Sequence, residues 1–475
     1  MCSKGNTLHL TASAPVTLQT RLLQPQRRLE RGGPLQRIAW DDALALATDR
    51  FAGIIAEHGR DALGFYVSGQ LLTEDYYVFN KLAKGLVATN NVDTNSRLCM
   101  SSAVAGYKIT LGADAPPACY DDLNHADTVF IVGSNMAFAH PILFRRLEDA
   151  KRARPGMKII VADPRRTETA EMADLYLPIL PGTDVALFNG MLHVMLWEGL
   201  TDSAYIAAHT TGFDALKARV RDYASKDIAK LCGIDEAALL LAAQWFGQAG
   251  ATLSLYCQGL NQSSSGTAKN AALINLHLAT GQIGKPGAGP FSLTGQPNAM
   301  GGREVGGLAT LLSGHRDLAD PEHRAEVAKL WGVADVPANP GKSAVEMFEA
   351  AADGEIKALW IASTNPAQSA RPGDRAACLA ARRIRRRAGG LCHHRDLRLR
   401  RPAAARHDLG REKRHRHEQR TLHQPGARGR HGARRSARRL AHRSGLCAAP
   451  RSPPTARLAD ALSLRHTRVD LERAP

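Results

Sequence analysis

The segment TLSLYCQGLNQSSSGTAKNAALINLHLATG, residues 252–281, decides the fold. Its beginning predicts a buried strand, the polar residues that follow predict a loop, and the remainder predicts a helix. Two earlier segments repeat this order: DTVFIVGSNMAFAHPILFRRLEDAKR at residues 127–152 and MKIIVADPRRTETAEMAD at residues 157–174. Strands that alternate with helices in this way predict an α/β protein with doubly wound parallel-sheet domains.

Polar side chains follow three of the predicted strands, at the point where each strand ends. The loops after Val132, Ala162 and Gln258 carry Asn, Asp, Arg, Thr or Gln. In sheets of this type ligands bind on the loops at the carboxyl ends of the strands. The repetition of polar loops is therefore more informative than any single loop.

Taken one at a time, these loops have structural as well as ligand-binding interpretations. The helix predicted after Gly133 has free N–H groups that can bind a phosphate, although a GxGxxG fingerprint is absent. Asp163 can accept a hydrogen bond from a ribose hydroxyl or a guanine edge, and Arg165 can contact a phosphate. The structural alternatives are an ordinary turn after Gly133, a helix cap by Asp163 or Thr167, and an N-cap by Thr183.

The net charge of the chain, +17, is concentrated at one end. Residues 371–475 hold 28 Arg and one Lys against eight Asp and Glu, a charge of +21, so the first 370 residues carry −4. This basic end has no Phe, Trp, Tyr, Met or Asn, so it lacks the apolar area that offsets the entropy of folding. We predict that it is disordered. A specific nucleic-acid partner has little support, because basic binding tails usually contain Lys and interleaved aromatics.

The cysteines and the apolar runs limit the class of protein. Eight cysteines are scattered without a paired framework, which favours a reducing compartment, and no apolar run of about 18 residues is present. The sequence therefore predicts a cytoplasmic protein without a membrane span. Motifs for zinc, for a nucleotide triphosphatase and for a serine hydrolase are absent, and Cys99 taken alone is typical of a buried thiol.

Several segments between Met1 and about Ser369 together resemble the molybdopterin-guanine-dinucleotide oxidoreductases, most closely the catalytic subunits of bacterial assimilatory nitrate reductases. The longest of them is highly specific. The segments are CSKGNTL, FYVSGQLLTEDYYVFNKL, NVDTNSRLCMSSAVAGYK, GSNMAFAHPI, DPRRTETAEMADLYLPILPGTD, GLNQSSSGTAKNAALINLHLATGQIGKPGAGPFSLTGQPNAMGGREVGG and LWIASTNP.

The resemblance implies that Cys99 is the thiolate ligand to molybdenum, and a soft thiolate suits a metal already held by dithiolene sulfurs. It implies that Cys2 is a ligand of a [4Fe-4S] cluster, with Lys4 between the cluster and the nearer pterin. Met100 and Arg303 would lie near the nitrate funnel. Two pterin guanine dinucleotides would contact the residues of the polar loops, namely Gln70, Ser134, Asn135, Asp163, Arg165, Gly182, Thr183, Asp184, Gly259, Asn261, Gln262, Thr364 and Asn365.

The implied reaction is the two-electron reduction of nitrate to nitrite by oxygen-atom transfer to molybdenum held by two molybdopterin guanine dinucleotides. The implied electron donor is ferredoxin, flavodoxin or an NADH-linked reductase. A formate dehydrogenase-like enzyme is the alternative, but that group places His directly after the metal-binding Cys or selenocysteine. Met100 follows Cys99 here, which favours nitrate.

Two features depart from the family. The chain begins one residue before Cys2, whereas the family has three more cluster cysteines upstream, so the cluster ligand set is incomplete. After about Ser369 the sequence resembles the translation of family DNA in the wrong reading frame. When the codons of residues 392–426 are read one base further on, suitable synonymous codons allow 35 consecutive residues that are typical of the family. We therefore expect a frameshift near residue 369 and a defective enzyme, and a non-catalytic truncated remnant is a further alternative.

The resemblance predicts a dimethyl sulfoxide reductase-like arrangement of five segments. Residues 1–40 would be a remnant of the iron–sulfur domain, and residues 41–115 the first part of α/β domain II. Residues 116–290 would form the pterin dinucleotide-binding α/β domain III, and residues 291–370 would return to domain II. Residues 371–475 would be the frameshifted tail, in place of the end of domain II and a C-terminal β-barrel.

Overall fold

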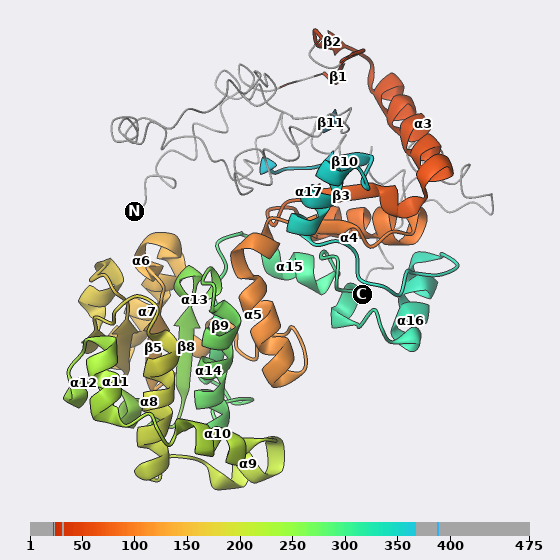
Figure 1. The fold of residues 1–475 in the computed structure, drawn as a ribbon. Helices are drawn as coiled ribbons and strands as arrows, with labels where there is room; N and C mark the ends of the chain where they lie inside the picture. The colour runs from red at the N-terminus through yellow and green to blue at the C-terminus, as the bar shows by residue number, and fades with distance from the viewer. Residues whose placement is uncertain (1–21, 23, 31–32, 367–386, 389–475) are drawn as a thin grey trace. The chain divides into compact units, whose positions relative to one another are not determined.

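The computed structural model describes residues 22, 24–30, 33–366 and 387–388. Of these, residues 98–297 form one compact unit, the first unit, and the residues before 98 and after 297 form the second unit (Figure 1). Cys2, Lys4 and the tail predicted to be disordered lie outside the described residues, apart from the short strand β11 (Arg387–Ala388). The five predicted segments and their boundaries stay predictions.

The first unit is built on a five-stranded sheet in which every neighbouring pair of strands is parallel. The strand order is β7-β6-β5-β8-β9, so the order reverses between β5 and β8. This arrangement confirms the predicted doubly wound parallel sheet, and the reversal marks the switch point at which such sheets bind ligands. The strands are β5 (Thr128–Val132), β6 (Lys158–Ala162), β7 (Leu175–Leu177), β8 (Thr252–Tyr256) and β9 (Gly289–Ser292).

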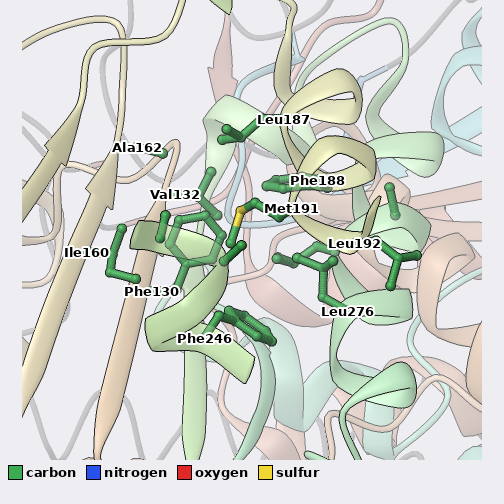
Figure 2. Close-up of a cluster of buried hydrophobic side chains, with 14 of the residues drawn as sticks. Phe130, Val132, Ile160, Ala162, Leu187, Phe188, Met191, Leu192, Phe246 and Leu276 are labelled. Atoms are coloured by element: carbon green, nitrogen blue, oxygen red, sulfur yellow. The ribbon is translucent and has the colours of Figure 1, made fainter. Parts of the chain in front are cut away.

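Helices cover both faces of this sheet because alternate residues of each buried strand point to opposite faces. Phe130 and Val132 of β5 share a core with α8, α12 and α14, and Figure 2 shows these two side chains together with Phe188, Phe246 and Leu276. The intervening residues Val129 and Ile131 pack with α7 in a second core. The helices of the unit are η3 (Tyr120–Asn124), α6 (Met136–Ala139), α7 (Pro141–Ala153), η4 (Glu168–Met172), α8 (Asp184–Trp197), α9 (Ser203–His209), α10 (Phe213–Val220), α11 (Ser225–Cys232), α12 (Glu236–Gln248), α13 (Gln258–Asn261) and α14 (Gly266–Ala279).

Two local features differ from the sequence prediction. The single helix predicted after Gly133 is divided into α6 and α7, because Pro141 lacks an N–H and disfavours helical geometry at His140, whose φ and ψ are −131° and 57°. The glycine-rich segment 281–310 contains β9 and α15 (Ala299–Glu304), which the pattern did not predict. Glycine and proline have low strand and helix propensity, so tertiary packing decides the structure there.

The second unit contains a four-stranded parallel sheet in the order β11-β10-β3-β4. Leu63, Phe65 and Val67 of β3 share a core with α3 and α4, whereas Tyr66 packs with α17. In the described ranges no helix combines the length and hydropathy needed to cross a membrane. The elements are β1 (Gln26–Arg27), β2 (Gln36–Arg37), α3 (Trp40–His58), η1 (Arg60–Ala62), β3 (Leu63–Val67), α4 (Thr73–Asn80), the π-helix η2 (Lys81–Val87), β4 (Val92–Thr94), α15, η5 (Ser313–His315), α16 (Pro321–Trp331), α17 (Ala344–Asp353) and β10 (Ala358–Ile361); α5 (Ser96–Leu111) leads into the first unit.

A fully buried histidine makes the first unit sensitive to acid. His277 of α14 lies with its Nε2 2.7 Å from Ser254 Oγ, and burial lowers the pKa of His277 to about 3. The unfolded chain, with a histidine pKa of about 6.5, binds more protons than the folded chain between these two values. The free energy of unfolding therefore falls as the pH is lowered from about 6.5 towards 3.

We predict that His277→Gln, which keeps a hydrogen-bonding group but does not titrate, removes this part of the pH dependence. Between pH 7 and pH 5 the free energy of unfolding should fall by about 2 kcal/mol more in the wild type than in the variant. Urea unfolding at both pH values measures the difference, with the exposed His209→Gln as the control for loss of a histidine. Equal pH dependence in the wild type and His277→Gln would contradict the prediction.

Candidate functional site

The loops that follow β5 and β8 touch through their backbones at the switch point. The N–H of Gly259 donates to the carbonyl oxygen of Gly133 at 3.0 Å, and a Cβ on Gly259 would lie 2.5 Å from the Cα of Gly133. Gly133 also has a φ of +56°, which favours glycine. Both positions therefore require glycine, and the loops meet without any side chain between them.

Ser134 and Asn135 follow Gly133 and differ in their hydrogen bonding. Asn135 donates to Glu168 Oε2 at 3.2 Å and accepts from Thr169 Oγ1 at 3.0 Å, so it ties the loop after β5 to the loop after β6. Ser134 is buried, but its Oγ has no hydrogen-bond partner among the described residues. A buried hydroxyl without a partner is costly, so Ser134 is the residue of this loop that fits a ligand contact.

Asp163 and Arg165 lie on the loop after β6. The Asp163 carboxylate accepts from the backbone N–H of Arg165 at 2.9 Å, and the Tyr176 hydroxyl donates to the Asp163 carbonyl at 3.0 Å. This is a local turn and not the helix cap considered from the sequence. Thr167 precedes η4 without capping it, and its buried Oγ1 has no hydrogen-bond partner in the described part of the chain.

Asp184 at the start of α8 forms a buried ion pair. Its Oδ2 lies 2.6 Å from Lys269 Nζ, with side-chain exposures of 8% and 5%, and Lys269 also donates to the carbonyl of Gly259 at 3.3 Å. The ion pair thus joins α8, α14 and the switch-point loop. Thr183 occupies the N-cap position of α8, but its hydroxyl donates back to the carbonyl of Leu180 at 2.7 Å instead of capping the helix. Gly182 before it is exposed, with a φ of +90°.

Two glutamine amides surround the sulfur of Cys99. Cys99 lies on α5 and is buried, and its Sγ accepts from Gln258 Nε2 at 3.1 Å and from Gln262 Nε2 at 3.7 Å. Met100 is also buried and interrupts the helix, with φ and ψ of −143° and 17°. The structure therefore places Gln262, a predicted pterin contact, and Gln258, which was not predicted, beside Cys99.

Other polar groups fix the two ends of the segment that carries these glutamines. Asn261 donates to Ser292 Oγ at 2.9 Å and accepts from Asn270 Nδ2 at 3.2 Å, all in the interior. The thiol of Cys257 donates to the carbonyl of Leu293 at 3.0 Å, and burial raises the pKa of Cys257 to about 12. The Asn261 side chain is consequently engaged within the protein.

Among the residues that the structure describes, four of the predicted site residues belong to the second unit. Gln70 follows β3, and Thr364 and Asn365 follow β10, so they lie at the same edge of the sheet because Tyr66 and Ile361 pair in parallel register. Arg303 is buried in α15, with Nη1 3.3 Å from Met300 Sδ.

Both ends of α15 are held by hydrogen bonds that sequence reasoning missed. Asn298 Nδ2 donates to the carbonyl of Leu71 at 2.9 Å before the helix. After the helix, the fully buried Lys84 donates to the carbonyls of Gly306, Leu308 and Leu311 at 2.6, 2.9 and 2.5 Å. Burial lowers the pKa of Lys84 to about 7. These bonds fix the segment that carries Arg303.

Sequence reasoning missed Lys84, Lys269 and Gln258 for two different reasons. Lys269 is a charged residue on a helix that is otherwise largely apolar, which is a signal that the sequence contains. Lys84 and Gln258 have partners 222 and 159 residues away, and only the fold brings such residues together.

Comparison with known proteins gives three findings. The family model described as molybdopterin oxidoreductase matches residues 21–377. The chain is 47% identical over 371 residues to the nitrate reductase of Synechocystis sp., which covers 78% of this chain and 51% of that protein. It is 35% identical over 353 residues to formate dehydrogenase H of Escherichia coli, covering 74% and 49%.

Among solved structures, acetylene hydratase from Pelobacter acetylenicus is similar with a TM-score of 0.62 and 23% sequence identity, covering 80% of this chain and 54% of that one. This likeness concerns the fold. The chain spans about half the length of the curated relatives described above.

The contact between Gly133 and Gly259 leads to a prediction about stability. Gly259→Ala should lower the free energy of unfolding by about 1–3 kcal/mol, because the added methyl group would overlap backbone atoms that cannot rotate away. Gly156→Ala is the matched control, since no atom lies within 4 Å of its Cβ position. Urea unfolding of both variants measures the effect. Equal free energies of unfolding in Gly259→Ala and Gly156→Ala would contradict the prediction, because they would show that the two loops can move apart without cost.

The buried ion pair leads to a second prediction. Lys269→Met should lower the free energy of unfolding by about 3–5 kcal/mol, because it leaves the Asp184 carboxylate buried without its counter-charge. In the double variant Asp184→Asn with Lys269→Met, the free energy of unfolding should fall by less than the sum of the decreases caused by the two single substitutions. Arg152→Met breaks an exposed ion pair with Asp149 and should cost no more than about 1 kcal/mol. A decrease of only about 1 kcal/mol in the free energy of unfolding of Lys269→Met would contradict the prediction.

Proposed function

The chain belongs to the molybdopterin oxidoreductase family, and we propose that it is the catalytic part of a nitrate reductase that uses a molybdenum–pterin cofactor. The nitrate reductase relative is more similar to the chain than the formate dehydrogenase is, which supports nitrate as the substrate. In this proposal the cofactor is the bis(molybdopterin guanine dinucleotide) form, and the electrons come from ferredoxin, flavodoxin or an NADH-linked reductase.

The observation that carries the proposal is the buried Cys99 sulfur with two amide donors, on the unit whose switch-point loops approach through glycines. A thiolate is a soft ligand that suits molybdenum, and amide donors on the sulfur are typical of the surroundings of a metal-bound thiolate. The partnerless hydroxyls of Ser134 and Thr167 also fit a group that supplies phosphate or ribose oxygens. The residues present therefore fit the cofactor.

The residues divide into ligand, contact and positioning roles. Cys99 would bind the metal, and when bound the cofactor would supply two-electron redox chemistry and oxygen-atom transfer. Asp184 and Asn261 act in positioning, since their side chains are bonded to Lys269, Ser292 and Asn270. The proposed cofactor contacts are Ser134, Asn135, Asp163, Arg165, Gly182, Thr183, Gly259 and Gln262 in the first unit, and Gln70, Thr364 and Asn365 in the second.

Arg303 is the residue proposed to bind nitrate. Its guanidinium is planar and permanently charged, and it matches a planar oxyanion by two parallel hydrogen bonds. Burial strengthens this attraction because water does not screen the charge. Lys84 and Asn298 hold the segment in place, so that Arg303 is preorganised for the anion. Met100, which follows Cys99 in the sequence, is a buried apolar side chain.

The test is nitrite formation by the full chain with reduced methyl viologen, after production in cells that make molybdenum cofactor. We expect that Cys99→Ala abolishes nitrite formation and lowers the molybdenum content. Arg303→Lys should raise the KM for nitrate about tenfold, since one charge-assisted hydrogen bond is worth about 1.4 kcal/mol. The exposed Arg152→Lys is the control for an Arg-to-Lys change.

Two outcomes would contradict this function. Viologen-linked formate oxidation without nitrate reduction would identify the chain as formate dehydrogenase-like. Absence of both activities, together with absence of molybdenum, would identify it as a non-catalytic remnant. An unchanged KM in Arg303→Lys would remove Arg303 from the substrate site.

A further inference from the structure

The side chain of Gln258 bridges two sulfur atoms. Its Nε2 lies 3.1 Å from Cys99 Sγ, and its Oε1 contacts the sulfur of Cys257. The same thiol is 3.0 Å from the carbonyl of Leu293, so Cys257 is held to the segment after β9. The resemblance to the family assigns no role to either Gln258 or Cys257.

The orientation of this amide has a chemical consequence. A carboxamide has a donor end and an acceptor end, and only the donor end attracts a negatively charged sulfur. If the amide were turned over, its oxygen would face Cys99 and would repel a thiolate. In the structure the Nε2 end of Gln258 faces Cys99, at 3.1 Å, and this is the end that attracts a thiolate.

We propose that Gln258 is a positioning residue for Cys99, and that its amide N–H donates to the Cys99 sulfur. The part of this inference that concerns the reduction potential of the metal rests on the proposed function. A hydrogen bond to a metal-bound sulfur withdraws electron density from the metal and raises its reduction potential. Gln262, whose Nε2 is 3.7 Å from the same sulfur, makes a longer and weaker contact. Gln258 is therefore the main donor.

The hydrogen bond is tested first in the metal-free full chain. With ¹⁵N-labelled glutamine, the side-chain amide signal of Gln258 is identified by its loss in Gln258→Leu. We expect Cys99→Ala to shift this signal and to accelerate its hydrogen exchange. A Gln258 signal that is indifferent to Cys99→Ala overturns the proposal.

The effect on the metal is tested in the molybdenum-loaded chain by redox titration followed by electron paramagnetic resonance. Gln258→Leu should have a lower molybdenum reduction potential than the wild type. Gln244→Leu is the matched control, because it makes the same change in an amide that donates to Glu198. An unchanged potential in Gln258→Leu overturns the tuning role. If the chain loads no molybdenum, the proposed function fails. The amide signal of the metal-free chain then still shows whether Gln258 donates a hydrogen bond to Cys99.

Discussion

The close approach of Gly133 and Gly259 is the constraint on which the first unit's site depends. The two backbones lie within hydrogen-bonding distance, at 3.0 Å, and no Cβ fits between them. The same loop is bound a second time by Lys269, which reaches the Gly259 carbonyl from α14 and is itself paired with Asp184 of α8. A loop of the chain that is fixed at its backbone can hold Gln258 and Gln262 at a defined distance from Cys99.

The sequence was sufficient to predict the sheet but not all of the site. Residues 127–281 alternate buried apolar runs with amphipathic segments, and that pattern determines a doubly wound sheet whatever the loops do. The motifs singled out Cys99 and Gln262 for different predicted roles, and in the structure the Gln262 amide lies 3.7 Å from the Cys99 sulfur. Gln258 was not predicted, because its partner is 159 residues away and a glutamine after a strand has many possible roles. The break at His140 could have been predicted from Pro141.

The predicted cofactor contacts divide into two classes once hydrogen bonds are counted. Asp184 and Asn261 have strong partners inside the protein, so they organise the loops. Ser134 has a buried hydroxyl without a partner in the described ranges, and so does Thr167, which the sequence suggested only as a helix cap. A folded protein rarely leaves a buried hydroxyl unpaired, so these two residues fit a ligand better than the others do. Sequence motifs cannot separate the classes, because both consist of the same polar residue types.

The two buried lysines show how glycine-rich segments are held in place. Glycine permits close backbone approach, but it has no side chain that could pack against a core. Each segment is instead bound through its carbonyl oxygens: Lys269 binds Gly259, and Lys84 binds Gly306, Leu308 and Leu311. A buried ammonium group is costly to desolvate, and burial accordingly lowers the pKa of Lys84. Three carbonyl dipoles offset that cost for Lys84 and a carboxylate offsets it for Lys269, so each lysine fixes a glycine-containing segment by electrostatics in place of apolar packing.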